Sequence, residues 1–283
     1  MAKIAFITDS TAYLHDDFVA KHKIKVVPLN LHWDGEDFKD NVNITPKEFY
    51  TRLEQAENLP TTSQPSAGEF MEAYKSVSKD VDAIIVPLVS SGISGTVASA
   101  LLAAKEFDKV PVHVVDSKVT SAGLALLVQA LVRKAESGAS VKDILAVADK
   151  IIKDTGLYFM VDTLKYLHKG GRIGGASAFL GSAINLKPIL TLNEAGEIDA
   201  YDKVRTKKKA VQRLIDLIVE KAGKKDAHVG LIHAEAEEDA NKILADIKDR
   251  VNCVETGVYI ISPVIGTHAG PGALGVAVHT IDC

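Results

Sequence analysis

Short apolar runs alternate with helix-forming segments through the first half of the chain, and this alternation constrains the fold more than any other feature. The runs predict strands at residues 3–8, 25–33, 82–89 and 110–116. Several of them are apolar without polar–apolar alternation, which is typical of strands buried on both faces. Because helical segments lie between them, we expect an N-terminal α/β domain whose mostly parallel sheet is covered by helices.

Capping signals mark where several of these helices begin. Thr45 to Glu48 and Ser66 to Glu69 each form a capping box, and Pro46 stands at the first helical position of the first of them. A long helical region follows over residues 121–155, with Gly138 in the break between its two helices. The domain boundary is predicted near the end of this region, which divides the chain into residues 1–155 and 156–283.

The second half has a different pattern of elements. Apolar segments predict strands at 156–162, 187–193, 197–204, 228–235 and 257–264, and two amphipathic helices are expected at 206–223 and 237–250. The stretch "LNEAGEIDAY" has the character of a hairpin, so we expect antiparallel pairing here. This half is therefore predicted to be an α+β domain with a mixed or antiparallel sheet.

Composition and charge argue against several classes of protein, namely nucleic-acid-binding, membrane-spanning and secreted proteins. The chain has 283 residues, of which 47% are hydrophobic and 25% charged, and its formal net charge is -4. A nucleic-acid-binding protein usually carries a basic excess, so nucleic acid is not expected as a partner. No apolar run approaches the roughly 20 residues that span a bilayer, and "MAKIAFITDS" resembles a strand more than a signal peptide. Cytoplasmic localisation is the resulting expectation.

Two hydroxyl-rich loops are candidates for a ligand site. In "LPTTSQPSAGEF", Ser66 is explained as a helix cap, but Thr61, Thr62 and Ser63 are not. Their side chains belong either to a ligand site or to an ordinary Ser/Thr-rich turn. In "TDST" at residues 8–11, after the first strand, Asp9, Ser10 and Thr11 either cap a helix in a strand-to-helix turn or line a ligand crevice.

The stretch "SSGISGT" at residues 90–96 leads from a strand into a helix. Backbone N–H groups and the helix dipole at such a position favour an anion, and Ser94 adds a hydroxyl donor. The phosphate-binding signature GxxxxGK[ST] is absent. A nucleophile elbow is also excluded, because Thr96 stands where G-x-S-x-G requires its last glycine.

The C-terminal stretch "GTHAGPGALG" contains a match to G-x-G-x-x-G, but too few residues follow it for the helix and acidic residue of a dinucleotide site. We expect its glycines to form tight turns that bring His268 close to a ligand, although a lone histidine is also commonly structural. The histidines and the two cysteines have no metal-ligand spacing, so no metal site is predicted.

Two basic features have both a plain and a functional interpretation. Arg172 lies among glycines in "HKGGRIGG", and Arg205 begins the basic run "RTKKK" at a helix start. Cations at a helix N-terminus interact unfavourably with the helix dipole. On a solvated surface, salt screening reduces this cost, and the plain interpretation is therefore an exposed basic surface. The functional alternative is a docking face for an acidic partner or a phosphate.

Six motifs together resemble the DegV family, which includes the fatty-acid-binding subunits of bacterial fatty acid kinase. They occur in family order and nearly span the chain: "FITDST", "PTTSQPS", "SSGISGT", "VVDSKVTSAG", "LKYLHKGGRIGG" and "HAGPGALG". The resemblance implies two α/β domains that bind a single long-chain fatty acid such as palmitate, stearate or oleate. Val97 departs from the family pattern, since many relatives have a tyrosine after "SGT".

The resemblance also implies roles for particular residues. The carboxylate ligands would be Thr62, Ser94 and His268, with Thr61, Ser63 and Gly95 as neighbours. Arg172 and Arg205 would face the kinase catalytic subunit that phosphorylates the bound acid. The chain itself would then be a carrier with no catalytic residues and no cofactor. It would not insert stably into a membrane, although transient membrane contact is compatible with this role.

Two rival functions remain open at this point. A Ser/His acyl hydrolase would use Ser94 and His268, with Asp116 or Asp9 orienting the imidazole. The other rival is a general sensor or carrier of another small carboxylate or anion.

Overall fold

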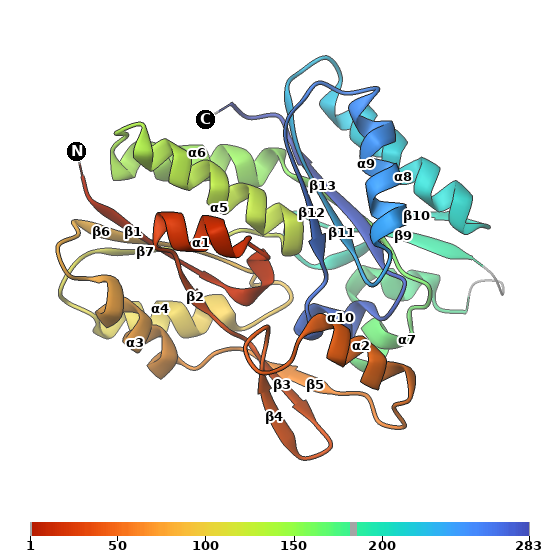
Figure 1. Cartoon of the computed structure of the whole chain (residues 1–283), viewed down its shortest axis with the longest axis horizontal. Helices are drawn as coiled ribbons and strands as arrows, with labels where there is room; N and C mark the ends of the chain where they lie inside the picture. The colour runs from red at the N-terminus through yellow and green to blue at the C-terminus, as the bar shows by residue number, and fades with distance from the viewer. Residues whose placement is uncertain (1, 182–185, 283) are drawn as a thin grey trace.

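A parallel sheet organises the first half of the chain, as the alternating pattern predicts. The computed structural model describes residues 2–181 and 186–282 (Figure 1). Four parallel strands lie in the order β2-β1-β6-β7, formed by Lys25–Val27, Ile4–Asp9, Ala83–Leu88 and Val112–Asp116. β6 is buried along its whole length. The strands predicted at 3–8, 82–89 and 110–116 are therefore confirmed.

Helices cover both faces of this sheet. On one face α3 (Ala67–Val77) and α4 (Thr96–Glu106) pack against Ile84 and Val86. On the other face α5 (Ser121–Glu136) and α6 (Val141–Asp154) pack against Phe6 and Ile85, with α1 (Asp16–His22) beside them. Both predicted capping boxes are present, at α3 and at α2 (Pro46–Glu54).

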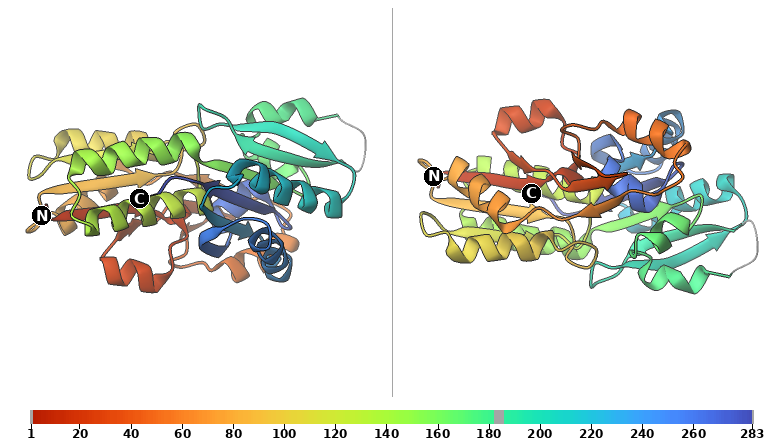
Figure 2. Two further views of the ribbon diagram at one scale, coloured as in Figure 1. Left: turned by 90° about the horizontal axis from the view of Figure 1, so that it is seen from above. Right: turned by 90° about the horizontal axis from the view of Figure 1, so that it is seen from below.

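A second sheet of six strands forms most of the other half (Figure 2). All neighbouring strands are antiparallel except β11 and β12, and β9 with β10 forms the predicted hairpin. The helices α8 (Lys207–Ala222) and α9 (Glu237–Lys248) cover one face. The order is β10 (Ile198–Val204), β9 (Lys187–Leu192), β8 (Gly156–Met160), β13 (Leu274–His279), β11 (Ala227–His233) and β12 (Cys253–Ile260). The predicted mixed sheet is confirmed, whereas the domain boundary after residue 155 stays a prediction.

One predicted strand is wrong in its extent. The segment 25–33 leaves the parallel sheet after Val27, because Pro28 has no N–H to donate and the Leu29 N–H bonds to Ser10 Oγ at 3.2 Å. The chain then enters a small antiparallel sheet with the order β4-β3-β5. Its strands are Glu36–Lys39, Asn30–Trp33 and Thr61–Ser63. Three residues of the predicted hydroxyl-rich loop at 59–70, Thr61–Ser63, are thus a strand.

The C-terminal segment also differs from the prediction. The strand expected at 257–264 ends at Ile260, and Pro263 begins the short helix α10 (Pro263–Ala269). Proline suits the first helical position, so Pro263 starts this helix where the sequence predicts a strand. His268 consequently lies in the last turn of a helix, not in a Gly/Pro turn. The run after Gly272 forms β13, an unpredicted strand that pairs with both β8 and β11.

The face of the six-stranded sheet opposite α8 and α9 packs against the rest of the molecule. Leu157 and Ile232 from this face join a core that includes Trp33 of β3, Phe49 of α2 and Leu126 of α5. Side chains of the short helices α10 and α7 (Lys165–Lys169) also pack into this core. In residues 2–181 and 186–282, no helix has both the length and the apolar character needed to cross a membrane.

Asp40 is a buried polar link between distant parts of the chain. Its carboxylate accepts hydrogen bonds from Ser10 Oγ at 2.7 Å, Ser262 Oγ at 2.9 Å and the Val264 N–H at 3.1 Å. Burial raises the pKa of Asp40 to about 6, and the hydrogen bonds only partly oppose this shift. The carboxyl group therefore titrates in a range where exposed aspartates are already ionised.

This raised pKa predicts a pH dependence of stability. The folded-state pKa of about 6 lies above the ordinary value of 3.8, so folding favours the protonated carboxyl. Ionisation costs stability progressively between these two values, and the cost is constant above them. Asp40→Asn stays neutral and keeps an acceptor oxygen, so wild type should lose stability relative to this variant between pH 4 and about pH 6. Urea unfolding across this range measures the difference, and a constant difference would contradict the assignment.

Candidate functional site

A largely apolar pocket lies in the core on the face of the six-stranded sheet opposite α8 and α9. Strands β8, β9, β10 and β11 form part of its wall. α10 and the chain leading into β13 contribute further apolar surface. The principal apolar lining residues are Leu157, Phe159, Leu192, Ile198, Ile232, Ile261, Val264, Ala269 and Ala273. A mainly apolar lining with a few polar side chains is typical of sites for small organic ligands.

Polar side chains gather at one part of this pocket. Thr62 Oγ1 and His268 Nε2 form a hydrogen bond of 2.8 Å, although they lie 206 residues apart. β5 supplies Thr62 and α10 supplies His268. Thr62 lines the pocket, whereas Thr61 before it on the same strand is exposed. We call Thr62, Ser94, Arg172 and His268 the polar cluster, since all four line the pocket.

His268 is a neutral imidazole in this setting. Burial, and secondarily the positive charge of Arg172, lowers the pKa of His268 to about 4. Its Nδ1 atom is buried and has no hydrogen-bond partner within the described residues. In the tautomer with the proton on Nε2, His268 donates to Thr62 Oγ1, and the Thr62 hydroxyl proton is free for an acceptor in the pocket.

The segment around residue 170 holds the imidazole in place. A Cβ on Gly170 would lie 2.1 Å from His268 Nδ1, so only glycine leaves room for the ring. Two residues further on, Arg172 is half-buried and donates from Nε to the Ile93 carbonyl at 3.2 Å and from Nη1 to the Gly170 carbonyl at 2.9 Å. These bonds place a guanidinium beside the neutral histidine and the loop that carries Ser94.

Ser94 and Gly95 lie at the start of α4, as the sequence predicts. Ser94 Oγ lies 2.8 Å from Thr96 Oγ1, and Gly95 is the N-cap residue of the helix. A Cβ on Gly95 would come within 2.8 Å of Gln64 Nε2, so this glycine permits close approach of the β5 loop. The two hydroxyl-rich loops are therefore adjacent at the pocket.

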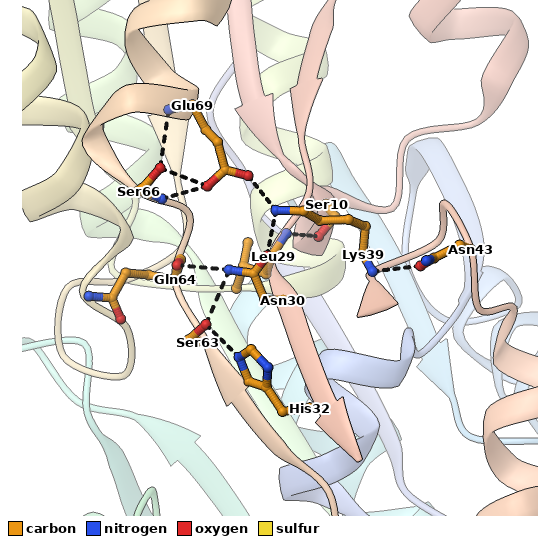
Figure 3. A network of polar contacts seen from close by, with 10 residues as sticks. All are labelled: Ser10, Leu29, Asn30, His32, Lys39, Asn43, Ser63, Gln64, Ser66 and Glu69. Atoms are coloured by element: carbon orange, nitrogen blue, oxygen red, sulfur yellow. Dashed lines mark hydrogen bonds and ion pairs between the residues drawn. The ribbon is translucent and has the colours of Figure 1, made fainter. Parts of the chain in front are cut away.

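Other predicted site residues occupy different surroundings. Ser63 lines the pocket, but its hydroxyl accepts from Asn30 Nδ2 at 3.1 Å and lies 3.0 Å from His32 Nε2 (Figure 3). Thr61 is exposed and borders a surface depression outside the pocket. Arg205 is exposed between β10 and α8. Of the two arginines expected at a docking face, Arg172 thus also belongs to the pocket.

The catalytic arrangement of an acyl hydrolase is not assembled. Ser94 is bonded to Thr96, and His268 is bonded to Thr62. Asp116 instead accepts from the Ser91 N–H at 3.0 Å and pairs with Lys118 at 2.8 Å. The other candidate, Asp9, accepts hydrogen bonds from the Thr11 and Val89 N–H groups, which is the turn-capping role considered for "TDST". In the two described ranges, no three side chains of the metal-binding types converge.

Sequence reasoning missed three polar residues that line the pocket, namely Gln64, Thr120 and Ser121. The last two lie inside the motif "VVDSKVTSAG", immediately before the apolar run of α5. Two consecutive hydroxyl residues at a predicted helix start were the available signal, and a capping role would have explained them. Only the packing of α5 against the second sheet brings them to the pocket.

Comparisons with known proteins agree with this architecture. The model of the family described as "Uncharacterised protein, DegV family" matches residues 3–280. Protein DegV of Bacillus subtilis is 37% identical over 275 residues, which cover 96% of this chain and 98% of that protein.

Solved structures give the same result. A structure described as DegV, a fatty acid binding protein from Bacillus subtilis, superposes with a TM-score of 0.92 at 35% identity and covers 99% of this chain and 100% of its own. A Thermus thermophilus DegV family protein, described by its fatty acid binding, has a TM-score of 0.94 at 33% identity, with coverage of 99% and 100%. The chain therefore belongs to the DegV family.

Proposed function

We propose that this protein binds one long-chain fatty acid in the pocket and presents its carboxylate to a separate kinase, which forms the acyl phosphate. The observation that carries this proposal is the polar cluster on the wall of a largely apolar pocket. The fatty acid binding of DegV relatives supports it further. The polar cluster would hold the carboxylate, and the apolar walls would enclose the acyl chain.

The chemistry of the polar cluster suits a carboxylate. Burying an unpaired carboxylate is costly, whereas each hydrogen bond to a charged group contributes about 1.5–3 kcal/mol. Thr62 and Ser94 supply hydroxyl donors, and Arg172 supplies a positive charge. A carboxylate at this position would also raise the low pKa of His268, because a nearby negative charge favours the imidazolium.

The apolar walls would supply most of the gross affinity. Each buried methylene contributes about 0.8 kcal/mol, so about fourteen methylenes contribute on the order of 11 kcal/mol. Immobilising the ligand and ordering its chain offset much of this. The pocket shape would then select chain length mainly through steric exclusion.

Phosphoryl transfer would be the task of the kinase. A carboxylate oxygen would attack the γ-phosphorus of a nucleoside triphosphate, and the bond to the nucleoside diphosphate would break. The chain lacks a P-loop signature, and its contribution would be to hold the carboxylate in a fixed position. Such a reaction would take place in the cytoplasm, where nucleoside triphosphate is available.

The exposed Arg205 tests the docking part of this proposal. We expect Arg205→Glu to leave stearate affinity unchanged and to lower kinase-dependent acyl-phosphate formation by about tenfold, since a reversed rim charge mainly slows association. Titration with stearate and trapping of the acyl phosphate with hydroxylamine measure the two properties. Arg172→Glu should weaken stearate binding as well, because Arg172 lines the pocket.

Lys224→Glu is the matched control, because it makes the same charge change at an exposed position beyond the other end of α8. It should leave both properties unchanged. Equal turnover with the Arg205→Glu and Lys224→Glu proteins would remove Arg205 from the docking face.

A further inference from the structure

Thr120 and Ser121 line the pocket outside the polar cluster, as Ser63 and Gln64 also do. Thr120 is 8% exposed and Ser121 is fully buried, and both stand at the start of α5. Neither Thr120 Oγ1 nor Ser121 Oγ has a hydrogen-bond partner that meets normal geometry within residues 2–181 and 186–282. Buried hydroxyls usually have partners, so this pair requires an explanation.

Thr120 holds the N-cap position of α5 but does not cap the helix with its side chain. Among the helices that the structure describes, α2, α3, α6 and α8 each have an N-cap hydroxyl that accepts a backbone N–H. These hydroxyls belong to Thr45, Ser66, Ser140 and Thr206. At α5 only the backbone of Thr120 takes part, and its carbonyl accepts the Gly123 N–H at 3.1 Å. Its hydroxyl is therefore available to the pocket, where an apolar chain would leave it unsatisfied.

Ser121 has an unusual backbone conformation for a serine. Its φ angle is 55°, in the left-handed region that is uncommon for residues other than glycine. The Tyr13 hydroxyl lies near its side chain and accepts the Ser262 N–H at 3.0 Å. Ser121 thus has a polar neighbour, the Tyr13 hydroxyl, whereas the Thr120 hydroxyl has no hydrogen-bond partner within the described residues.

We infer that Thr120 and Ser121 form a second polar subsite that hydrogen-bonds to an oxygen on the acyl chain, so that the protein takes hydroxy or oxo fatty acids as a substrate class. This inference rests on the proposed function. No charged side chain belongs to the pair, so a neutral oxygen is a better match than a second carboxylate. The N-terminus of the 16-residue helix α5 also favours an electronegative atom at this position.

The subsite makes a specific demand on the ligand. The polar cluster fixes the carboxylate and Thr120 is fixed in the pocket wall, so the chain oxygen must lie a set distance from the carboxylate. A hydroxyl at any other carbon would lose its water without gaining a partner. Affinity should therefore depend on the position of the hydroxyl.

A positional series tests this inference. Displacement titrations compare stearate with its 3-hydroxy, 10-hydroxy and 12-hydroxy derivatives on wild type, Thr120→Val and Thr120→Ser. We expect the best-matched hydroxy acid to bind on the order of tenfold tighter than the other two, as one buried hydrogen bond allows. Thr120→Val keeps the shape of the side chain and should abolish this preference among the hydroxy acids, while Thr120→Ser should retain it.

Other outcomes would overturn the inference. If wild type binds the three hydroxy acids with equal affinity, the inference is overturned whatever the variants show. A uniform loss for all four acids in Thr120→Val would assign this hydroxyl to the carboxylate instead. If stearate binds wild type but the position of the hydroxyl does not change the affinity, only this inference fails. If none of the acids binds, the proposed function itself is contradicted.

Discussion

Ala273→Phe is expected to weaken stearate binding by about two orders of magnitude, which is the largest effect that a single substitution in the pocket wall should produce. Ala273 is 1% exposed and lines the pocket just before β13. Its carbonyl accepts the Ala234 N–H at 2.9 Å, a main-chain bond that the substitution leaves in place. A phenyl ring would occupy the space of about four methylenes, and about 0.8 kcal/mol for each gives roughly 3 kcal/mol.

Chain length provides the internal control for this variant. Laurate has a shorter acyl chain than stearate and should lose much less affinity if the ring blocks part of an elongated pocket. Ala273→Val adds less volume and should have an intermediate effect. Displacement titrations with both acids measure these differences, and thermal unfolding shows whether each variant is folded. Equal losses for the two acids in a folded Ala273→Phe protein would contradict an acyl site beside Ala273.

Gly170→Ala is expected to weaken fatty acid binding by about ten- to a hundredfold through the carboxylate end of the site. The φ angle of Gly170 is -77°, so alanine fits the backbone, but its Cβ would lie 2.1 Å from His268 Nδ1. The imidazole must then move, and its 2.8 Å bond to Thr62 is lost. Misplacing one donor to a charged group removes about 1.5–3 kcal/mol, which corresponds to this range.

Gly68→Ala is the matched control. Gly68 lies inside α3, where a Cβ would meet only Ser66 Oγ at 3.8 Å, an ordinary contact. Alanine is favoured over glycine in a helix by about 1 kcal/mol, so this variant should unfold at the same or a higher temperature and bind stearate as wild type does. If Gly170→Ala also binds stearate like wild type, His268 does not help to hold the carboxylate.

Local signals predicted most of the fold. The capping boxes at Thr45 and Ser66 and the fully apolar run of β6 each depend on a few neighbouring residues, and all three are present as expected. The predictions that were wrong concern where a strand ends and which strands it pairs with, and these depend on contacts between distant parts of the chain. Pro28 ends β2 and redirects the chain into another sheet, and β13 exists because β8 and β11 accept it as a central strand.

The site was predictable only in part for the same reason. The resemblance to a family named Thr62, Ser94 and His268, and the structure brings these residues to one pocket. The inward position of Arg172 depends on carbonyl groups of Ile93 and Gly170, which no sequence pattern reports. The role of Thr120 was hidden because a threonine before an apolar helix is normally explained as a cap.

Native mass spectrometry of protein purified without detergent tests the central claim most directly. The account predicts one long-chain fatty acid per chain, identified after extraction, and its depletion from the Ala273→Phe protein. Folded wild-type protein that carries no acyl lipid and fails to take up added stearate would contradict it.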